Sequence, residues 1–155
     1  VTARGTLLLD SLGWHGGRIN ASGEFRDSAV RDPVTGEQRR ISEDLVRRWS
    51  VDIRHDIPRS QIAWGGSISE DRSAPTFRLD QLFSAHLSQP IATLFVEHKD
   101  VMGLTVRLAL RNVLNGHDDI RRTFYVNRRN GPVDYSEQQI RNIHLIGVLT
   151  ISGAF

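Results

Sequence analysis

The chain has 155 residues, an apolar fraction of 39%, a formal net charge of +2 and no cysteine. No stretch approaches the roughly 18 consecutive apolar residues of a membrane-spanning helix, which excludes a helical membrane protein. The strands of a transmembrane barrel alternate apolar and polar residues, so an ordinary average composition leaves that class open. The lack of cysteine excludes both a disulfide framework and a thiolate site.

Period-two alternation of apolar and polar residues recurs along the chain and predicts half-buried strands. In chain order we expect seven strands, near residues 2–10, 19–26, 48–54, 62–69, 89–97, 104–111 and 143–155. The clearest is 104–111, in which Arg107 and Arg111 share one side and four apolar residues share the other. The first and fifth strands are less regular, because Leu8 and Phe95 fall on the polar side.

Short connections rich in Gly, Pro and Asp alternate with long polar connections. The short ones lie near residues 11–17, 56–61 and 98–103, and the long ones near 31–45, 70–88 and 115–138. This order places the tight turns at one end of the sheet and the long loops at the other. Outer-membrane barrels have this asymmetry, whereas a β-sandwich has no reason to keep it. The predicted fold is all-β, an antiparallel up-and-down meander of about seven strands that forms part of a transmembrane β-barrel.

The two faces of the strands are predicted to meet different surroundings. Charged residues on one face, such as Glu24, Arg54 and Arg107, suit a water-filled lumen. Residues of the other face are predicted to face lipid, and they include Leu104, Val106, Leu108, Leu110, Trp49, Val51, Ile53 and Trp64. Aromatic residues near both ends of the strands fit two interfacial girdles, or alternatively the packing of a protein core.

The last segment, GVLTISGAF (147–155), alternates apolar residues and stops on an aromatic residue. Together with FVEHKDVMGLTVRLALRNVLN (95–115) and RRNGPV (128–133), it resembles the C-terminal end of TonB-dependent outer-membrane receptors. The resemblance implies an assembly signal that the barrel-insertion machinery reads, made of Leu149, Ile151, Gly153 and Phe155. A free edge strand is also the element that strand addition captures.

The same resemblance implies a receptor in the outer membrane of a Gram-negative bacterium that takes up a siderophore, cobalamin, a carbohydrate or another scarce ligand. Such receptors have a 22-stranded barrel with an N-terminal plug and a short periplasmic box that contacts TonB. Residues 1–155 have room for about seven strands and show neither plug nor box, so we expect the C-terminal segment of a longer barrel. Seven crossings would also place Val1 outside the cell, whereas complete barrels begin and end in the periplasm.

The expected partners follow from this interpretation. They are outer-membrane lipid, the remainder of the barrel and plug, the TonB system acting through that plug, and the barrel-assembly machinery. No nucleic-acid partner is expected, because the 18 carboxylates are interspersed with the arginines and no aromatic-rich basic stripe accompanies them.

Ligand contact is predicted in the long connections, where arginines are available to bind carboxylates or phosphates. The candidates are Arg39, Arg40, Arg121, Arg122, Arg128 and Arg129. Attraction to lipopolysaccharide phosphates, or solubility alone, explains the same arginines equally well.

No motif for catalysis, phosphate binding or zinc binding is found. The one cluster with ligand chemistry, His117 beside Asp118 and Asp119, is interpreted as a solvated loop tip. We therefore predict no enzymatic activity, no cofactor and no metal. The alternative interpretation is a soluble, secreted β-sandwich that acts as a binding module, and an enzyme with an unrecognised site is a more distant third.

Overall fold

The computed structural model describes residues 1–153, which form strands joined by turns and one short 3-10 helix, η1 (Asp10–Leu12). The larger sheet has seven strands in the order β1 (Thr2–Leu8), β2 (Gly17–Phe25), β5 (Leu45–Asp56), β6 (Ile62–Ser73), β9 (Ile91–Val101), β10 (Leu104–Arg111) and β13 (Ile146–Ser152). A four-stranded sheet has the order β12 (Val133–Asn142), β11 (His117–Tyr125), β8 (Gln81–Leu87) and β7 (Thr76–Phe77). A separate hairpin consists of β3 (Val30–Arg31) and β4 (Gln38–Arg39).

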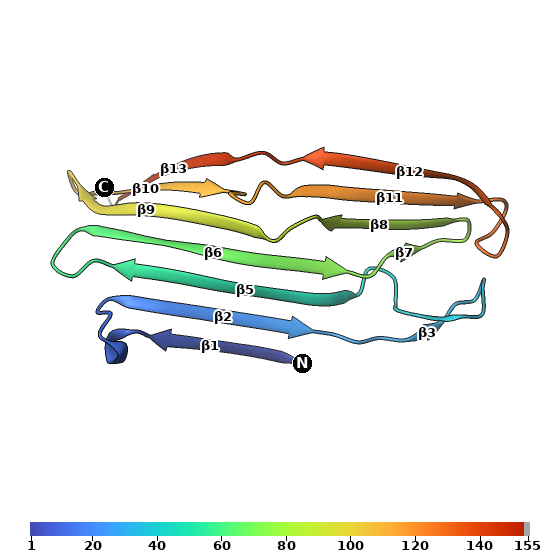
Figure 1. Ribbon diagram of the computed structural model, residues 1–155, viewed down its shortest axis with the longest axis horizontal. Helices are drawn as coiled ribbons and strands as arrows, with labels where there is room; N and C mark the ends of the chain where they lie inside the picture. The colour runs from blue at the N-terminus through green and yellow to red at the C-terminus, as the bar shows by residue number, and fades with distance from the viewer. Residues whose placement is uncertain (154–155) are drawn as a thin grey trace.

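Every strand pair of the seven-stranded sheet is antiparallel, so the predicted all-β meander is confirmed. The sheet is open and not a closed barrel, with β1 and β13 at its two edges. Figure 1 shows the strands side by side in a single layer, with the four-stranded sheet continuing the seven-stranded sheet end to end. No helix within residues 1–153 is long and apolar enough to cross a membrane.

The predicted short turns are confirmed, and they gather at the same end of the sheet (Figure 1). The tightest joins β9 to β10 through Met102 and Gly103, whose φ angles of 57° and 82° are both positive, as a two-residue hairpin turn requires. Asp100 Oδ1 accepts a hydrogen bond from the Gly103 amide at 2.9 Å and so fixes that turn. Neighbouring turns are also joined, since the Lys99 amide donates to the Gln61 carbonyl at 2.7 Å.

The long connections were predicted wrongly at two of three places. Residues 70–88 contain the end of β6 and all of β7 and β8, and residues 115–138 contain β11 and half of β12. In β11 and β12 polar side chains occur on both faces, so the sequence shows no clear apolar alternation there. The short strands β7 and β8 offer too few residues for a clear pattern. The connection at 31–45 holds only the β3–β4 hairpin and is otherwise a loop.

The two sheets are joined at four strand breaks, at residues 74–75, 88–90, 112–116 and 143–145. Asn112 joins two of these breaks and is only 2% exposed. Its side-chain amide donates to the carbonyls of Gly116 and His144 at 3.0 and 3.1 Å, and its oxygen accepts from the Gly116 amide at 2.9 Å. Asn112 and His144 have positive φ angles of 59° and 42°, which end the strands at this level. The final strand, predicted near residues 143–155, therefore begins only at Ile146, and residues 143–145 lie in the break before it.

Candidate functional site

One face of the seven-stranded sheet is apolar from edge to edge. Register places Leu108 between Leu149 of β13 and Val96 of β9, and Val96 is in turn the partner of Trp64 in β6. On the other side of β6 the apolar face continues through β5 and β2 to β1. The residues on this face include Leu7, Ile19, Ala21, Trp49, Val51, Ile53, Trp64, Ile68, Leu94, Val96, Val106, Leu108, Leu110, Leu149 and Ile151.

This face is uncovered. Leu108 is 48% exposed, Leu149 63% and Leu94 55%. Within residues 1–153 only four apolar residues are buried, namely Leu9, Leu45, Ala63 and Ala74, so no core lies between two layers. The residues predicted to face lipid do share one exposed face, and Leu104 at its edge sits beside a register shift between β9 and β10.

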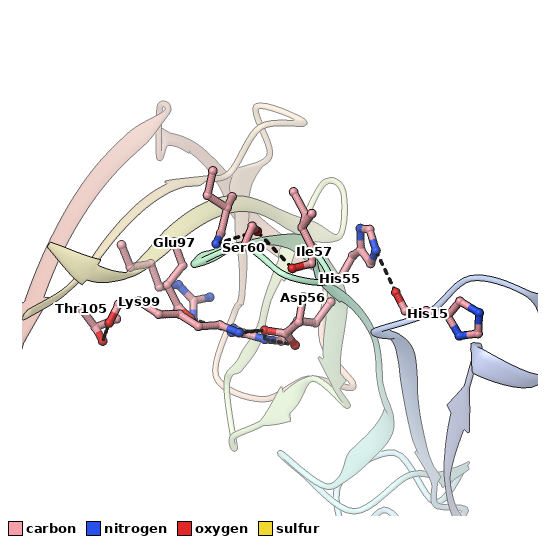
Figure 2. Close-up of polar contacts among 11 residues, drawn as sticks. His15, His55, Asp56, Ile57, Ser60, Glu97, Lys99 and Thr105 are labelled. Carbon is pink, nitrogen blue, oxygen red and sulfur yellow. Dashed lines mark hydrogen bonds and ion pairs between the residues drawn. The ribbon is translucent and has the colours of Figure 1, made fainter.

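Aromatic residues mark the end of the apolar face nearest the short turns. The ring of His55 lies 5.2 Å from that of Trp14 and 5.7 Å from that of Trp64, and the two Trp rings are 6.2 Å apart. His55 Nε2 is 3.2 Å from the carbonyl of His15, a contact drawn in Figure 2. These side chains come from β5, β6 and the β1–β2 turn, so they form a cluster that crosses three segments of the chain.

The opposite end of the apolar face is marked by Trp49 and Glu70, which are register partners on β5 and β6. The Trp49 indole N–H donates to Glu70 at 2.9 Å, and Arg47 donates to the same carboxylate at 2.7 Å. Beyond Trp49 and Glu70, on the side away from the short turns, charged residues occupy both faces of β5 and β6. The strand breaks at 88–90 and 112–116 lie at the same level, because Ile91 and Ala92 pair with Ser69 and Ile68.

The other face of the seven-stranded sheet carries a network of ion pairs near the short turns. Arg54 contacts Glu97 at 2.6 Å and Asp56 at 3.0 Å, and Lys99 contacts Asp56 at 2.7 Å. Arg107 lies 3.7 Å from Glu97. Figure 2 shows the sheet as an arc with Asp56 and Lys99 on its inner side, while His55 points to the outer side. The charged face is thus the concave one near the short turns.

Gly65 makes the centre of this network possible. A Cβ at position 65 would lie 2.1 Å from the Ile53 carbonyl oxygen and 2.9 Å from the Phe95 ring. The Phe95 side chain occupies that space and has the Arg107 guanidinium 3.7 Å from its ring centroid, a cation–π contact. Phe95 therefore lies on the charged face, as its irregular place in the sequence pattern indicated, and packs there against arginine.

A second cluster, the loop clamp, joins three connections at the far end of the molecule and consists of Asp32, Arg39, Phe77 and Arg129. Asp32 is 1% exposed. Its Oδ2 accepts hydrogen bonds of 2.5 Å from both Arg39 and Arg129. The two guanidinium groups also lie 4.3 and 5.2 Å from the Phe77 ring centroid.

Electrostatics keep the Asp32 carboxyl ionised. Burial by itself raises its pKa, but the hydrogen bonds from Arg129 and Arg39 outweigh that effect. The backbone amides of Val34 and Thr35 also donate to Asp32 Oδ1, at 2.8 and 3.1 Å. The pKa of Asp32 is held well below its ordinary value as a result.

The six arginines predicted to contact ligand have different environments. Arg39 and Arg129 are held in the loop clamp, and Arg40 contacts Asp27 at 2.9 Å. Arg121 and Arg122 lie on β11 and not in a loop, which corrects their predicted location. Arg121 contacts Asp119 at 2.9 Å, and Arg122 is 3.7 Å from Glu137. Arg128 is exposed in the loop between β11 and β12.

The predicted assembly signal is described only in part. Leu149 and Ile151 lie on the apolar face of β13, and Gly153 packs against Leu104, where an added Cβ would be 2.5 Å from the Leu104 side chain. Phe155 lies outside the described residues.

His117, Asp118 and Asp119 begin strand β11 and do not form a loop tip. His117 Nδ1 contacts the Ser88 hydroxyl at 3.1 Å, and Asp118 is paired with Arg141. Among residues 1–153, no group of three or more His, Cys, Asp or Glu side chains is placed to hold a metal ion.

Two important residues escaped the sequence analysis, Asp32 and Gly65. The segment DPVTG (32–36) predicts a turn, and Asp32 does accept from the amides that follow it. Nothing local points to Arg129, which is 97 residues away in the chain.

Comparison of the chain with protein-family models, with curated proteins and with solved structures finds no match.

Proposed function

We propose that this chain forms part of the wall of a TonB-dependent outer-membrane β-barrel receptor, which takes up a scarce ligand such as a siderophore, cobalamin or a carbohydrate. The observation that carries the proposal is the exposed apolar face that crosses all seven strands, opposite a charged concave face. An apolar surface of this extent is stable only against another apolar surface, and hydrocarbon supplies one.

The dimensions of the apolar face support lipid contact. Ile62 and Glu70 of β6 are eight residues apart, which corresponds to about 27 Å along the strand. At the usual tilt of barrel strands this gives roughly 20 Å of height, a little less than the apolar band of about 25 Å typical of such barrels. The clusters around Trp64 and Trp49 then stand at the two interfaces, where indole rings with a hydrogen-bonding edge are favoured.

The charged face supports a water-filled interior. Arg54, Glu97, Asp56 and Lys99 form their network within one face of the sheet, and each would be costly to place in hydrocarbon. Facing the lumen, the same side chains keep contact with water and with one another.

The two open edges require further strands. Backbone groups exposed at β1 and β13 cannot remain unpaired in lipid. Both edge strands run toward the short-turn end, since β1 leads into the first short turn and β13 is antiparallel to β10. An antiparallel closure therefore needs an odd number of additional strands between them, and the remainder of the receptor is proposed to supply these together with the plug.

The proposed receptor meets its partners at its two ends and at its open edge. The TonB system acts through the plug at the short-turn end, and the barrel-assembly machinery takes up the edge strand β13 during insertion. Ligand arrives at the end formed by the four-stranded sheet and the loops.

Spin labelling tests the proposal directly. The 155 residues contain no cysteine, so single cysteines can be introduced at Val96, Leu108 and Leu149 and labelled within outer membranes, in a gene product from which any cysteine elsewhere has been removed. We expect these labels to be accessible to oxygen and protected from a water-soluble nickel chelate. Labels at the matched neighbours Glu97, Arg107 and Thr150 should show the opposite accessibility. The proposal would be contradicted if a carbonate wash extracted the protein from the membranes and the labels at all six positions were accessible to the nickel chelate.

A further inference from the structure

The four-stranded sheet contains a hollow of about 290 Å³ walled by arginine and phenylalanine side chains. The arginine–phenyl hollow is lined by Arg78, Gln81, Phe83, Arg122 and Phe124. Register explains why they meet: Arg122 is the partner of Phe83, and Phe124 is the partner of Gln81, so all four share one face of β8 and β11. The fifth residue, Arg78, enters from the turn before β8, where its guanidinium donates to the Gln81 side chain at 3.2 Å.

The guanidinium groups of this hollow are poorly neutralised. Within residues 1–153 no carboxylate lies within 4.0 Å of Arg78, and the nearest to Arg122 is that of Glu137 at 3.7 Å. By contrast Arg39, Arg40, Arg121 and Arg129 each have a carboxylate at 2.9 Å or closer. Arg78 and Arg122 therefore retain donors for an anion, and they are the two arginines that line the hollow.

We propose that the arginine–phenyl hollow binds a planar anion, such as an aromatic carboxylate. A guanidinium offers parallel N–H donors that match the two oxygens of a carboxylate. The rings of Phe83 and Phe124 provide flat apolar walls on which an aromatic ring stacks. The Arg122 guanidinium already lies 5.7 Å from the Phe83 ring centroid, so charge and ring wall are next to each other. A phosphate lacks the flat face, and a neutral sugar lacks the charge.

The loop clamp holds one side of this hollow in position. The Arg129 amide donates to the Leu79 carbonyl at 2.9 Å, and its side chain donates to the Arg78 carbonyl. The Arg78 amide in turn donates to the Gln81 carbonyl at 2.9 Å. Arg129 is thus a positioning residue, since it fixes the backbone that presents Arg78 without lining the hollow itself.

The inference deepens the proposed function, since it names a ligand class for the end of the receptor where ligand arrives, and it rests on that function for its biological meaning.

The test uses the full-length gene product, purified in detergent at low salt, and three probes in saturation-transfer NMR. Benzoate is the planar anion, cyclohexanecarboxylate is an anion without a flat ring, and benzyl alcohol is a flat ring without charge. The double variant Arg78→Gln/Arg122→Gln measures how much of each probe binds to the detergent micelle alone.

Benzoate should bind best, and each of Arg78→Gln and Arg122→Gln should weaken its binding by about tenfold. Arg111→Gln, which removes an exposed arginine of the seven-stranded sheet, should leave binding unchanged. Equal binding of cyclohexanecarboxylate, equal binding of benzyl alcohol, or benzoate signals no larger than those of the double variant would each overturn the inference. A protein that inserts into membranes without binding benzoate contradicts only this inference, whereas one that binds benzoate while staying soluble contradicts only the proposed function.

Discussion

The two sheets share a continuous run of antiparallel strands but differ in what their faces carry. The seven-stranded sheet has one apolar and one charged face, with Leu149 63% exposed on the apolar side. In the four-stranded sheet the edge strand β12 is exposed at every residue and is polar on both faces. The backbone ladder is therefore the same in both sheets, and the sheets differ in the pattern of their side chains.

The two regions also depend on different interactions between side chains. Within the seven-stranded sheet the contacts follow the strand register, as in the Arg54–Glu97 pair that spans β5 and β9. At the other end the loop clamp ties together segments that no register connects. The seven-stranded sheet is stabilised by many similar contacts between strands, and the loop end by a few long-range contacts. Single substitutions should therefore affect the two regions differently.

The largest effect is expected at Asp32. In Asp32→Asn the buried side chain can no longer neutralise Arg39 and Arg129, and breaking a buried pair in this way costs about 3–5 kcal/mol. The loss should be confined to the loops: hydrogen exchange should rise in residues 26–44 and 126–132, with β5 and β6 unchanged. A rise spread evenly over both sheets would show that the clamp is not a separate unit.

Acid should reproduce part of the Asp32→Asn effect in the unmodified protein. The pKa of Asp32 is lowered by folding, so its contribution to stability is complete above the ordinary aspartate pKa of 3.8 and is lost as the pH falls below that value. Hydrogen exchange in residues 26–44 should therefore match between the two proteins only at strongly acidic pH. Matching exchange at neutral pH would mean that the Asp32 charge stabilises nothing.

Leu108→Arg tests the apolar face of the seven-stranded sheet. A charge near the membrane midplane is expected to reduce the free energy of unfolding by about 2–4 kcal/mol in lipid bilayers. The matched change Arg107→Leu, one residue away on the charged face, should cost much less. Denaturant titration in vesicles measures both, and equal losses would contradict the assigned orientation of the faces.

Gly65→Ala tests the crowded centre of the charged face. The new methyl group would lie 2.1 Å from the Ile53 carbonyl oxygen, so β5 and β6 must separate, at a cost of about 1–3 kcal/mol. Gly147→Ala is the control, because a Cβ there has nothing within 4 Å. Unfolding by denaturant should separate the two variants clearly, and similar stabilities would show that β5 and β6 are not packed as closely as described.

Period-two alternation was enough to predict the seven-stranded sheet, because apolar side chains lie on one of its faces and polar side chains on the other. Residues 104–111 show this directly: Leu108 and Arg107 fall on the faces predicted for them. The strands of the four-stranded sheet were missed because polar side chains occur on both faces of β11 and β12, so the sequence shows no clear alternation there. In β11, for example, Asp119, Arg121 and Thr123 lie on one face, and the other face mixes Asp118 and Arg122 with Ile120 and Phe124.

The candidate site was less predictable than the sheet, for a different reason. Arginine content drew attention to the long connections, but it could not show that Arg121 and Arg122 lie on β11, nor which arginines carboxylates already neutralise. That depends on contacts such as Asp32 with Arg129, which are set by the folded chain and not by neighbouring residues. Arg78 was overlooked because a single arginine in a turn has no local feature to distinguish it.

The smallest effect is expected at Arg121, on the face of β11 opposite Arg122. Its pair with Asp119 lies within one strand at 2.9 Å, and the Arg121 side chain is 58% exposed, so solvent and salt screen the attraction. Arg121→Ala should leave the midpoint of thermal unfolding nearly unchanged, both at low and at high salt. A large loss on this substitution would mean that something covers β11 in the complete protein. The four-stranded sheet would then no longer be the water-exposed region, and the contrast with the seven-stranded sheet would have to be explained by a protein contact instead of by solvent.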